Sequence, residues 1–345
     1  MWAITVLPFL GNFWLRRILR YAEVVGAFCM VVFFFVSIIT LLVMAEKSPA
    51  SYVFSTLTHD TSGWTNPAIA WGIGLLTMAY PLTGFDAVLH MSDEVKKARI
   101  RVPRSMITSV VLNSIMQFTY MLTVLFTIGD VEKVTADPLP IIQVYYQATG
   151  SKAATNLFMS VFAIVIFVSL INILASDSRL LWAFARDNGL PFSKTFAQVH
   201  PKFKVPVNAL VLVASCLCIL ALINVGSSAA FNAFISLPAL ALYISYFFPI
   251  FFLFLRRLSR ARSSIQWGPF KLGFFGPFIN LGAMCYLVFS IIWMPFPTML
   301  PVDQLNFNYA GPIIGAVIVG ALLDWCISGR KRFQVPVARL NPGSA

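Results

Sequence analysis

Residues 67–90, which read PAIAWGIGLLTMAYPLTGFDAVLH, are apolar over a length that crosses a membrane, yet they do not suit one continuous helix. About 20 apolar residues are enough for a helical span. Pro81 removes a backbone hydrogen bond and clashes with the preceding turn, and a glycine such as Gly84 costs about 1 kcal/mol relative to alanine. The sequence therefore predicts a helix that breaks at membrane depth, at Tyr80, Pro81, Leu82, Thr83 and Gly84.

Two interpretations of this break are open. Non-helical backbone inside a bilayer is tolerated where it lines a cavity or is buried in protein, and broken helices form the substrate site of many transporters. On this interpretation the backbone groups of residues 80–84 face a substrate. Proline and glycine are also common in ordinary spanning helices, so a kink that only aids packing is the alternative.

Asp86 lies two residues beyond the break. A carboxylate at the centre of a span costs at least about 2.5 kcal/mol, so such residues are usually functional. Asp86 is a candidate for binding a cationic group, for carrying a coupling proton, or for closing a gate with an arginine. The alternative is a residue at the wet end of the span. His90 is a weaker candidate for relaying protons, because a histidine at the interface is more often simply solvated.

A second set of polar residues lies at the end of the predicted span 154–174. Asn172 and Ser176 are candidates to line the same cavity, or they form helix–helix hydrogen bonds worth about 0.6 kcal/mol each. Arg179 is a candidate gating residue, and we expect it to pair with Asp177 or with Asp86.

Composition limits the class of protein. Of the 345 residues, 59% are hydrophobic and 11% are charged, against roughly 25% charged in a soluble domain. The net charge of +12 comes from short basic runs between apolar stretches rather than from one basic face, which disfavours a nucleic-acid partner. His59, His90 and His200 are not at ligand spacing, so we expect no enzyme, no metal and no other cofactor.

Eight segments are long and apolar enough to span a bilayer. The chain is thus predicted to be an all-α polytopic membrane protein, a single transmembrane domain over residues 1–345. The predicted spans are residues 22–44, 67–90, 106–128, 154–174, 206–225, 230–255, 275–292 and 309–327, with residues 1–10 as the remnant of a preceding helix and 328–345 as a tail.

Loop charge predicts the orientation. Assigning the loops alternately to two sides places 22 of the 25 basic residues on one side, and only Lys47, Lys133 and Lys152 on the other. Since positive loops stay inside, the basic side and the C-terminus are expected to be cytoplasmic.

Two stretches resemble a known family. Residues 83–95, TGFDAVLHMSDEV, with VPRSM at 102–106, and residues 178–193, SRLLWAFARDNGLPFS, are similar to signatures of the amino acid–polyamine–organocation superfamily, in its fungal GABA, choline and amino-acid permease branch. The resemblance implies a fold of twelve helices, ten of them in two inverted five-helix repeats. Residues 22–44 then correspond to the fifth helix and 67–90 to the sixth, so the second repeat is complete and the first four helices are largely missing.

The resemblance implies a secondary transporter of amino acids or related amines such as GABA or choline. It would work by alternating access in the plasma membrane, with H⁺ as the expected coupling ion. The alternative is a truncated fragment that does not transport, or an accessory membrane subunit.

Overall fold

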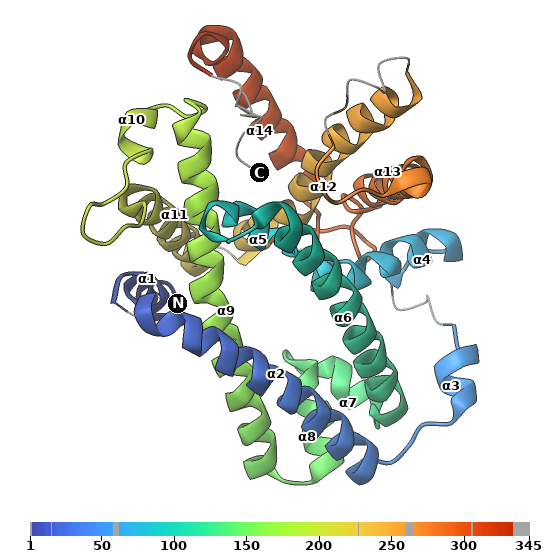
Figure 1. Ribbon diagram of the computed structural model, residues 1–345. Coiled ribbons are helices and arrows are strands. Elements are labelled where there is room, and N and C mark those ends of the chain that lie inside the picture. Colours follow the sequence, from blue (N-terminus) through green and yellow to red (C-terminus); the bar gives the residue numbers. More distant parts are fainter. Residues whose placement is uncertain are drawn as a thin grey trace.

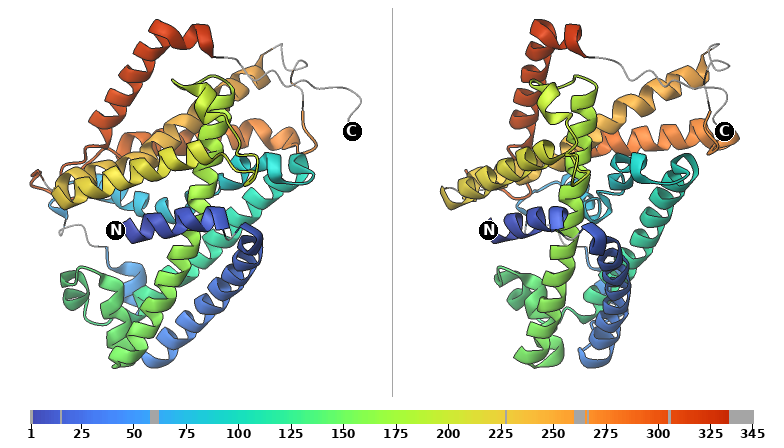
Figure 2. Two further views of the ribbon diagram at one scale, coloured as in Figure 1. Left: turned by 90° about the vertical axis from the view of Figure 1, so that its left-hand side faces the viewer. Right: turned by 60° about the vertical axis from the view of Figure 1, so that its left-hand side comes forward.

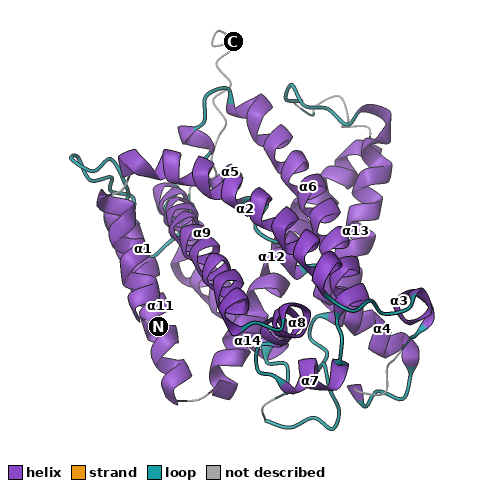
Figure 3. Ribbon diagram, turned by 90° about the horizontal axis from the view of Figure 1, so that it is seen from below, coloured by secondary structure: helices purple, strands orange, loops and turns teal. Residues whose placement is uncertain are grey.

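The computed structural model describes residues 2–14, 16–57, 62–226, 228–259, 265, 267–304 and 306–333. Within these ranges the chain is helical and holds no strand, as Figure 3 shows. Six of the described helices are long and apolar enough to cross a membrane, and the apolar part of α11, Val207–Ile223, is shorter. The predicted fold class, an all-α polytopic membrane protein, is therefore confirmed, although fewer long apolar helices were found than the eight predicted spans.

The N-terminal part contains α1 (Trp2–Trp14), α2 (Arg16–Met44), α3 (Ala50–Ser55), the broken segment, α6 (Ala98–Thr127), α7 (Val131–Ala136), α8 (Pro140–Thr149) and α9 (Lys152–Arg186). The rest contains α10 (Ser193–Phe196), α11 (Val207–Gly226), α12 (Ser228–Leu258), α13 (Gly276–Trp293), α14 (Ala310–Asp324), a π-helical turn (Trp325–Gly329) and α15 (Arg330–Arg332). In Figure 1 the long helix α9 runs through the length of the molecule.

Several helices extend beyond the predicted spans into charged sequence. The α6 helix begins at Ala98 rather than 106, and α9 continues to Arg186 rather than 174. Hydropathy detects only the apolar part of a helix, whereas the backbone stays helical until a residue stops it. At the end of α9, Asn188 adopts a left-handed conformation with φ of 56°, and Pro191 follows. Residues 1–10, predicted as a remnant, lie mostly in the 13-residue helix α1.

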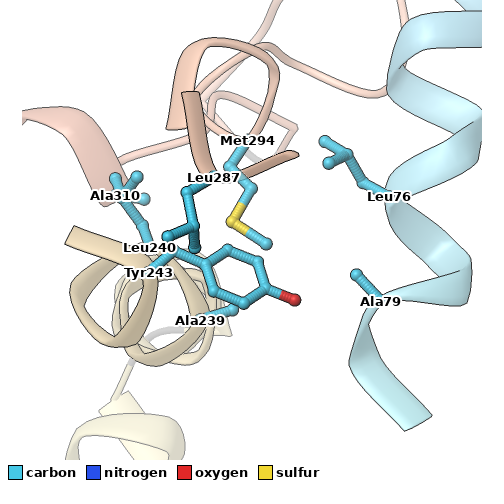
Figure 4. Packing of buried hydrophobic residues seen from close by; sticks show 8 residues of the cluster. All are labelled: Leu76, Ala79, Ala239, Leu240, Tyr243, Leu287, Met294 and Ala310. Carbon is cyan, nitrogen blue, oxygen red and sulfur yellow. The ribbon is translucent and has the colours of Figure 1, made fainter. Parts of the chain in front are cut away.

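Two apolar clusters organise the molecule. One joins the start of the broken segment to α12, α13 and α14, through Leu76, Ala79, Ala239, Leu240, Tyr243, Leu287, Met294 and Ala310 (Figure 4). The other joins α2 to α7, α8 and α9, through Leu41, Val134, Val144, Tyr145, Ala148 and Phe158. The long helices of both groups are inclined to one another in the views of Figure 2. The broken segment contacts both groups.

Candidate functional site: the broken helix and its cavity

The broken segment has two short α-helices joined by tighter turns. Helix α4 (Pro67–Leu75) begins at the N-cap Asn66, whose side chain accepts a hydrogen bond from Ala68 N, and ends well before the proline. Three-residue 3₁₀ turns follow at Leu76–Met78 and Tyr80–Leu82, and helix α5 (Ala87–His90) leads into a further turn at Ser92–Glu94. Pro81 has no N–H for an α-helical bond, so the chain tightens into i→i+3 bonds before it.

Gly84 turns the chain between the two halves. Its φ is +81°, and no heavy atom lies within 4 Å of the position that a β-carbon would occupy. A left-handed residue with a β-carbon costs roughly 1–2 kcal/mol, which glycine avoids. The predicted break at residues 80–84 is therefore observed, and it is longer than predicted, because regular α-helix already ends at Leu75.

The first half of the segment, residues 67–79, is held by apolar packing. Leu76 and Ala79 lie in the cluster formed with α12, α13 and α14 (Figure 4). Gly72 lies directly against α13, since a β-carbon there would be 2.9 Å from the ring of Trp293. Small residues let two helices approach closely, and that packing is what stabilises helix pairs in a membrane.

The second half, residues 87–94, is held by polar contacts to α9. Ser176 Oγ donates a hydrogen bond to the carbonyl of Ala87 at 3.3 Å. Farther along, Arg179 Nε donates to Glu94 Oε1 at 3.0 Å, and a guanidinium NH₂ group of Arg179 also donates to the Ala175 carbonyl and to Ser178 Oγ. The two halves are thus attached to different parts of the molecule by different forces.

A second, more exposed ion pair continues this contact. Arg186, two helical turns beyond Arg179, reaches Asp93 Oδ2 at 3.2 Å. The side chains of Arg186 and Asp93 are 51% and 66% exposed, whereas Arg179 is 10% exposed. The predicted pairing of Arg179 with Asp86 or Asp177 was wrong: its ionic partner is Glu94, because α5 lies on α9 with its C-terminal end toward the arginine.

Asp86 is buried, with 7% of its surface exposed. Its Oδ2 atom lies 3.1 Å from Nε2 of His90, one turn later. Asp177, on α9, is close enough to interact electrostatically with both groups, and Tyr246, on α12, interacts in the same way with Asp86. One carboxylate therefore contacts the imidazole next to the break, and a second lies near both.

A cavity of about 240 Å³ opens beside the break. Pro81 forms one wall, and α2, α6 and α9 form the others. The wall is mostly apolar, with phenylalanine and methionine side chains, and its polar groups are Ser37, Asn113, Gln117 and Tyr120. The hydroxyl of Ser37 is buried and has no hydrogen-bond partner in the described part of the chain. A mostly apolar cavity with a few polar groups is the usual form of a small-molecule site.

The structure brings some of the predicted residues together. Pro81 lines the cavity, Asp86 contacts His90, and Ser176 and Arg179 hold the second half. Leu82 and Asn172 are half-buried, while Thr83 and Gly84 are exposed, and none of these four lines this cavity. The side chain of Tyr80 lies outside the described residues. The roles of all of these residues in substrate binding, gating and proton coupling stay predictions.

The polar wall of the cavity was not predicted from the sequence. Asn113, Gln117 and Tyr120 are spaced by four and three residues, which places them on one face of α6. That stripe was visible in the sequence. Ser37 gave no such signal, because it is a single hydroxyl in a long apolar helix.

The geometry describes a multi-pass membrane protein in which a broken helix forms part of the wall of a mostly apolar cavity. The family model for "Amino acid permease" matches residues 1–319, and the chain belongs to this family. Residues 1–319 include every element of the site.

The curated relatives that the chain resembles include transporters and permeases. A putative amino acid/polyamine transporter of Macrophomina phaseolina is 34% identical over 279 residues, which cover 80% of this chain and 61% of that protein. A choline transporter of Saccharomyces cerevisiae is 33% identical over 308 residues, covering 87% and 53%. A homologue of the amino-acid permease BAT1 from rice, Oryza sativa subsp. japonica, is 29% identical over 348 residues, covering 98% and 64%. The chain thus spans between half and two thirds of the length of these relatives.

Proposed function

We propose that this chain belongs to a secondary active transporter of amino acids or related amines, which carries its substrate past the break at residues 80–84. The observation that carries the proposal is that Pro81, in the break, forms a wall of a cavity with polar groups. Backbone groups freed by the break would bind the charged ends of a substrate. The apolar walls would accept its carbon chain.

The two attachments of the broken helix suggest how access alternates. Apolar packing holds the first half against α12 and α13, while hydrogen bonds and ion pairs hold the second half on α9. Polar contacts near a membrane surface can be exchanged for contacts with water at little net cost. The second half would therefore separate from α9 and swing at Gly84, opening the cavity to one side.

Proton coupling is the proposed driving force. A proton taken up by the Asp86–His90 pair would change the charge next to the break, and Asp177 is a nearby second acceptor. The distribution of basic residues supports a cytoplasmic C-terminus, and we propose the plasma membrane as the location.

The test is uptake by the complete protein in yeast cells that lack their own choline and amino-acid permeases. Labelled choline, GABA, spermidine and neutral and basic amino acids are supplied at external pH 5 and 7.5. We expect saturable uptake of at least one compound, faster at pH 5, that is lost in Asp86→Asn and kept in Glu132→Gln, an exposed carboxylate outside the site. If none of these compounds is taken up, the proposed function is wrong.

A second candidate is that residues 1–345 alone transport nothing and serve as an accessory subunit. The coverage of 53–61% of the first two relatives favours testing it. Saturable uptake by the isolated 345-residue chain, lost in Asp86→Ala, would rule it out.

A further inference from the structure

Arg257 is a buried charge at the end of a membrane helix. It lies one residue before the last residue of α12 (Ser228–Leu258) and is 8% exposed, whereas its neighbour Arg256 is exposed. Its guanidinium carbon lies 4.6 Å from the ring centroid of Trp267. Its Nη1 atom lies so close to Gly276, the first residue of α13, that a β-carbon at that position would collide with it.

Within the described ranges the buried Nε atom of this guanidinium has no hydrogen-bond partner, and the group lies over the Trp267 ring. The attraction of a cation to an aromatic face is weaker than the cost of burying an isolated charge. The ring therefore offsets only part of the cost of burying Arg257.

The nearby helix end adds to this cost. Gly276 begins the 18-residue helix α13, whose amino end carries roughly half a positive charge. The guanidinium thus faces a second positive group. Helix α12 and α13 lie side by side in the structure, so this arrangement belongs to the packing of the two helices (Figure 1).

The local sequence holds no carboxylate that could neutralise Arg257. Between Asp187 and Asp303 there is no aspartate and no glutamate, so neither α12, nor α13, nor the connection between them supplies one. Lysine and arginine are present instead: Lys271 is exposed just before α13. The positive charge at this helix junction has to be balanced from outside these elements.

We propose that Arg257 and the amino end of α13 bind an anionic phosphate group, from a lipid headgroup or from free phosphate. An arginine presents a planar set of donors that matches two phosphate oxygens at once. The amino end of α13 would contribute its positive dipole rather than free N–H groups at its first two positions, because Gly276 N–H donates to Gly273 O and Pro277 has no N–H. The junction lies where the apolar part of α12 (Leu237–Leu258) ends, which is the level at which headgroups lie. The site does not depend on which substrate the protein transports.

The test uses the complete protein purified in a neutral detergent, with three added probes: phosphatidic acid, phosphatidylcholine and inorganic phosphate. Binding is measured by native mass spectrometry and thermal unfolding. We expect phosphatidic acid to bind and to raise the unfolding temperature, with about tenfold weaker binding in Arg257→Gln. Arg330→Gln, which removes an exposed arginine at the end of another helix, serves as the matched control and should bind as the wild type does.

Gly276→Ala tests the position of the Arg257 guanidinium without removing its charge. It keeps the arginine but displaces its guanidinium from the end of α13, so we expect it to weaken phosphatidic acid binding to a similar degree. Without lipid, Arg257→Gln should unfold at the same temperature as the wild type or higher, because it removes an unpaired buried charge. A purely structural arginine would give the opposite result.

The probes distinguish the source of the phosphate. Protection by phosphatidic acid but not by inorganic phosphate identifies a lipid site, and protection by millimolar inorganic phosphate, sensitive to Arg257→Gln, identifies a site for a soluble anion. The proposal is overturned if Arg257→Gln binds phosphatidic acid and phosphate as the wild type does. It is also overturned if that variant is less stable than the wild type without lipid, since Arg257 would then be satisfied within the protein.

Discussion

The two halves of the broken helix differ in what holds them. Leu76 and Ala79, in the first half, are buried among apolar side chains of α12, α13 and α14. The second half has no residue in that cluster and is attached to α9 by Ser176 and Arg179. Apolar packing is lost as soon as the surfaces separate, whereas polar groups can exchange their partners for water. In the proposed mechanism the first half is therefore the fixed part of the broken helix and the second half is the part that moves.

The largest expected effect is on the packing of the first half. Leu76 is 8% exposed, so Leu76→Ala should leave a cavity and destabilise the protein by about 2 kcal/mol, the lower end of the usual range for this substitution. Leu89 lies in α5 and is 49% exposed, and Leu89→Ala should change stability by less than about 0.5 kcal/mol. Unfolding in detergent measures both. Equal losses of stability in Leu76→Ala and Leu89→Ala would contradict the difference in packing between the two halves.

The next effect concerns the turn between the halves. Gly84→Ala adds a methyl group in open space, so its cost of roughly 1–2 kcal/mol comes from the left-handed backbone alone. Gly74→Ala also adds a methyl group in open space but lies in regular helix, where alanine is favoured by about 1 kcal/mol. We expect uptake at equal surface expression to fall about tenfold in Gly84→Ala and to stay within twofold of wild type in Gly74→Ala. Unimpaired uptake by Gly84→Ala would show that this backbone turn is dispensable.

A smaller effect separates the two ion pairs on α9. Glu94–Arg179 includes an arginine that is 10% exposed, whereas both partners of Asp93–Arg186 are more than half exposed. Double-mutant cycles with Glu94→Gln, Arg179→Gln, Asp93→Asn and Arg186→Gln should give a coupling of about 1 kcal/mol for the first pair and less than about 0.5 kcal/mol for the second. A larger coupling energy for Asp93–Arg186 would mean that the contact at the end of α9, rather than Glu94–Arg179, holds the second half.

The smallest effect is at the hydrogen bond nearest the break. Ser176→Ala removes one donor to the Ala87 carbonyl, and such a bond between membrane helices contributes about 0.6 kcal/mol. Ser169 is exposed on the same helix and, among the described residues, its hydroxyl donates to the Val165 carbonyl of α9 itself, so Ser169→Ala is the matched control. Thermal unfolding should show Ser176→Ala to be only slightly less stable than Ser169→Ala. A loss above about 2 kcal/mol in Ser176→Ala would mean that this contact, rather than the Arg179 pair, anchors the second half.

The sequence predicted the break because the physical causes are local. Pro81 and Gly84 act on the backbone next to them, and the charge of Asp86 is costly in any membrane helix. The partner of Arg179 could not be predicted in this way. Glu94 is 85 positions away, and their contact exists only because α5 packs along α9.

The residues that line the cavity could also be predicted only in part from the sequence. The polar stripe on α6 can be found from its spacing, but its meeting with Pro81 and with Ser37 of α2 depends on how three helices cross. Helix ends were misplaced for a different reason. Charged residues such as Arg104 and Arg179 interrupt an apolar run without ending the helix that contains them.

The central claim is that the substrate passes through the cavity beside Pro81, and substrate protection of a cysteine tests it most directly. In the complete protein without its native cysteines, Asn113→Cys places a thiol in the cavity wall, and Asn156→Cys places one on an exposed part of α9 outside it. We predict that a transported compound slows labelling at position 113 by a small thiol reagent and leaves labelling at 156 unchanged. Equal labelling rates at position 113 with and without a compound that the same protein transports would contradict the account.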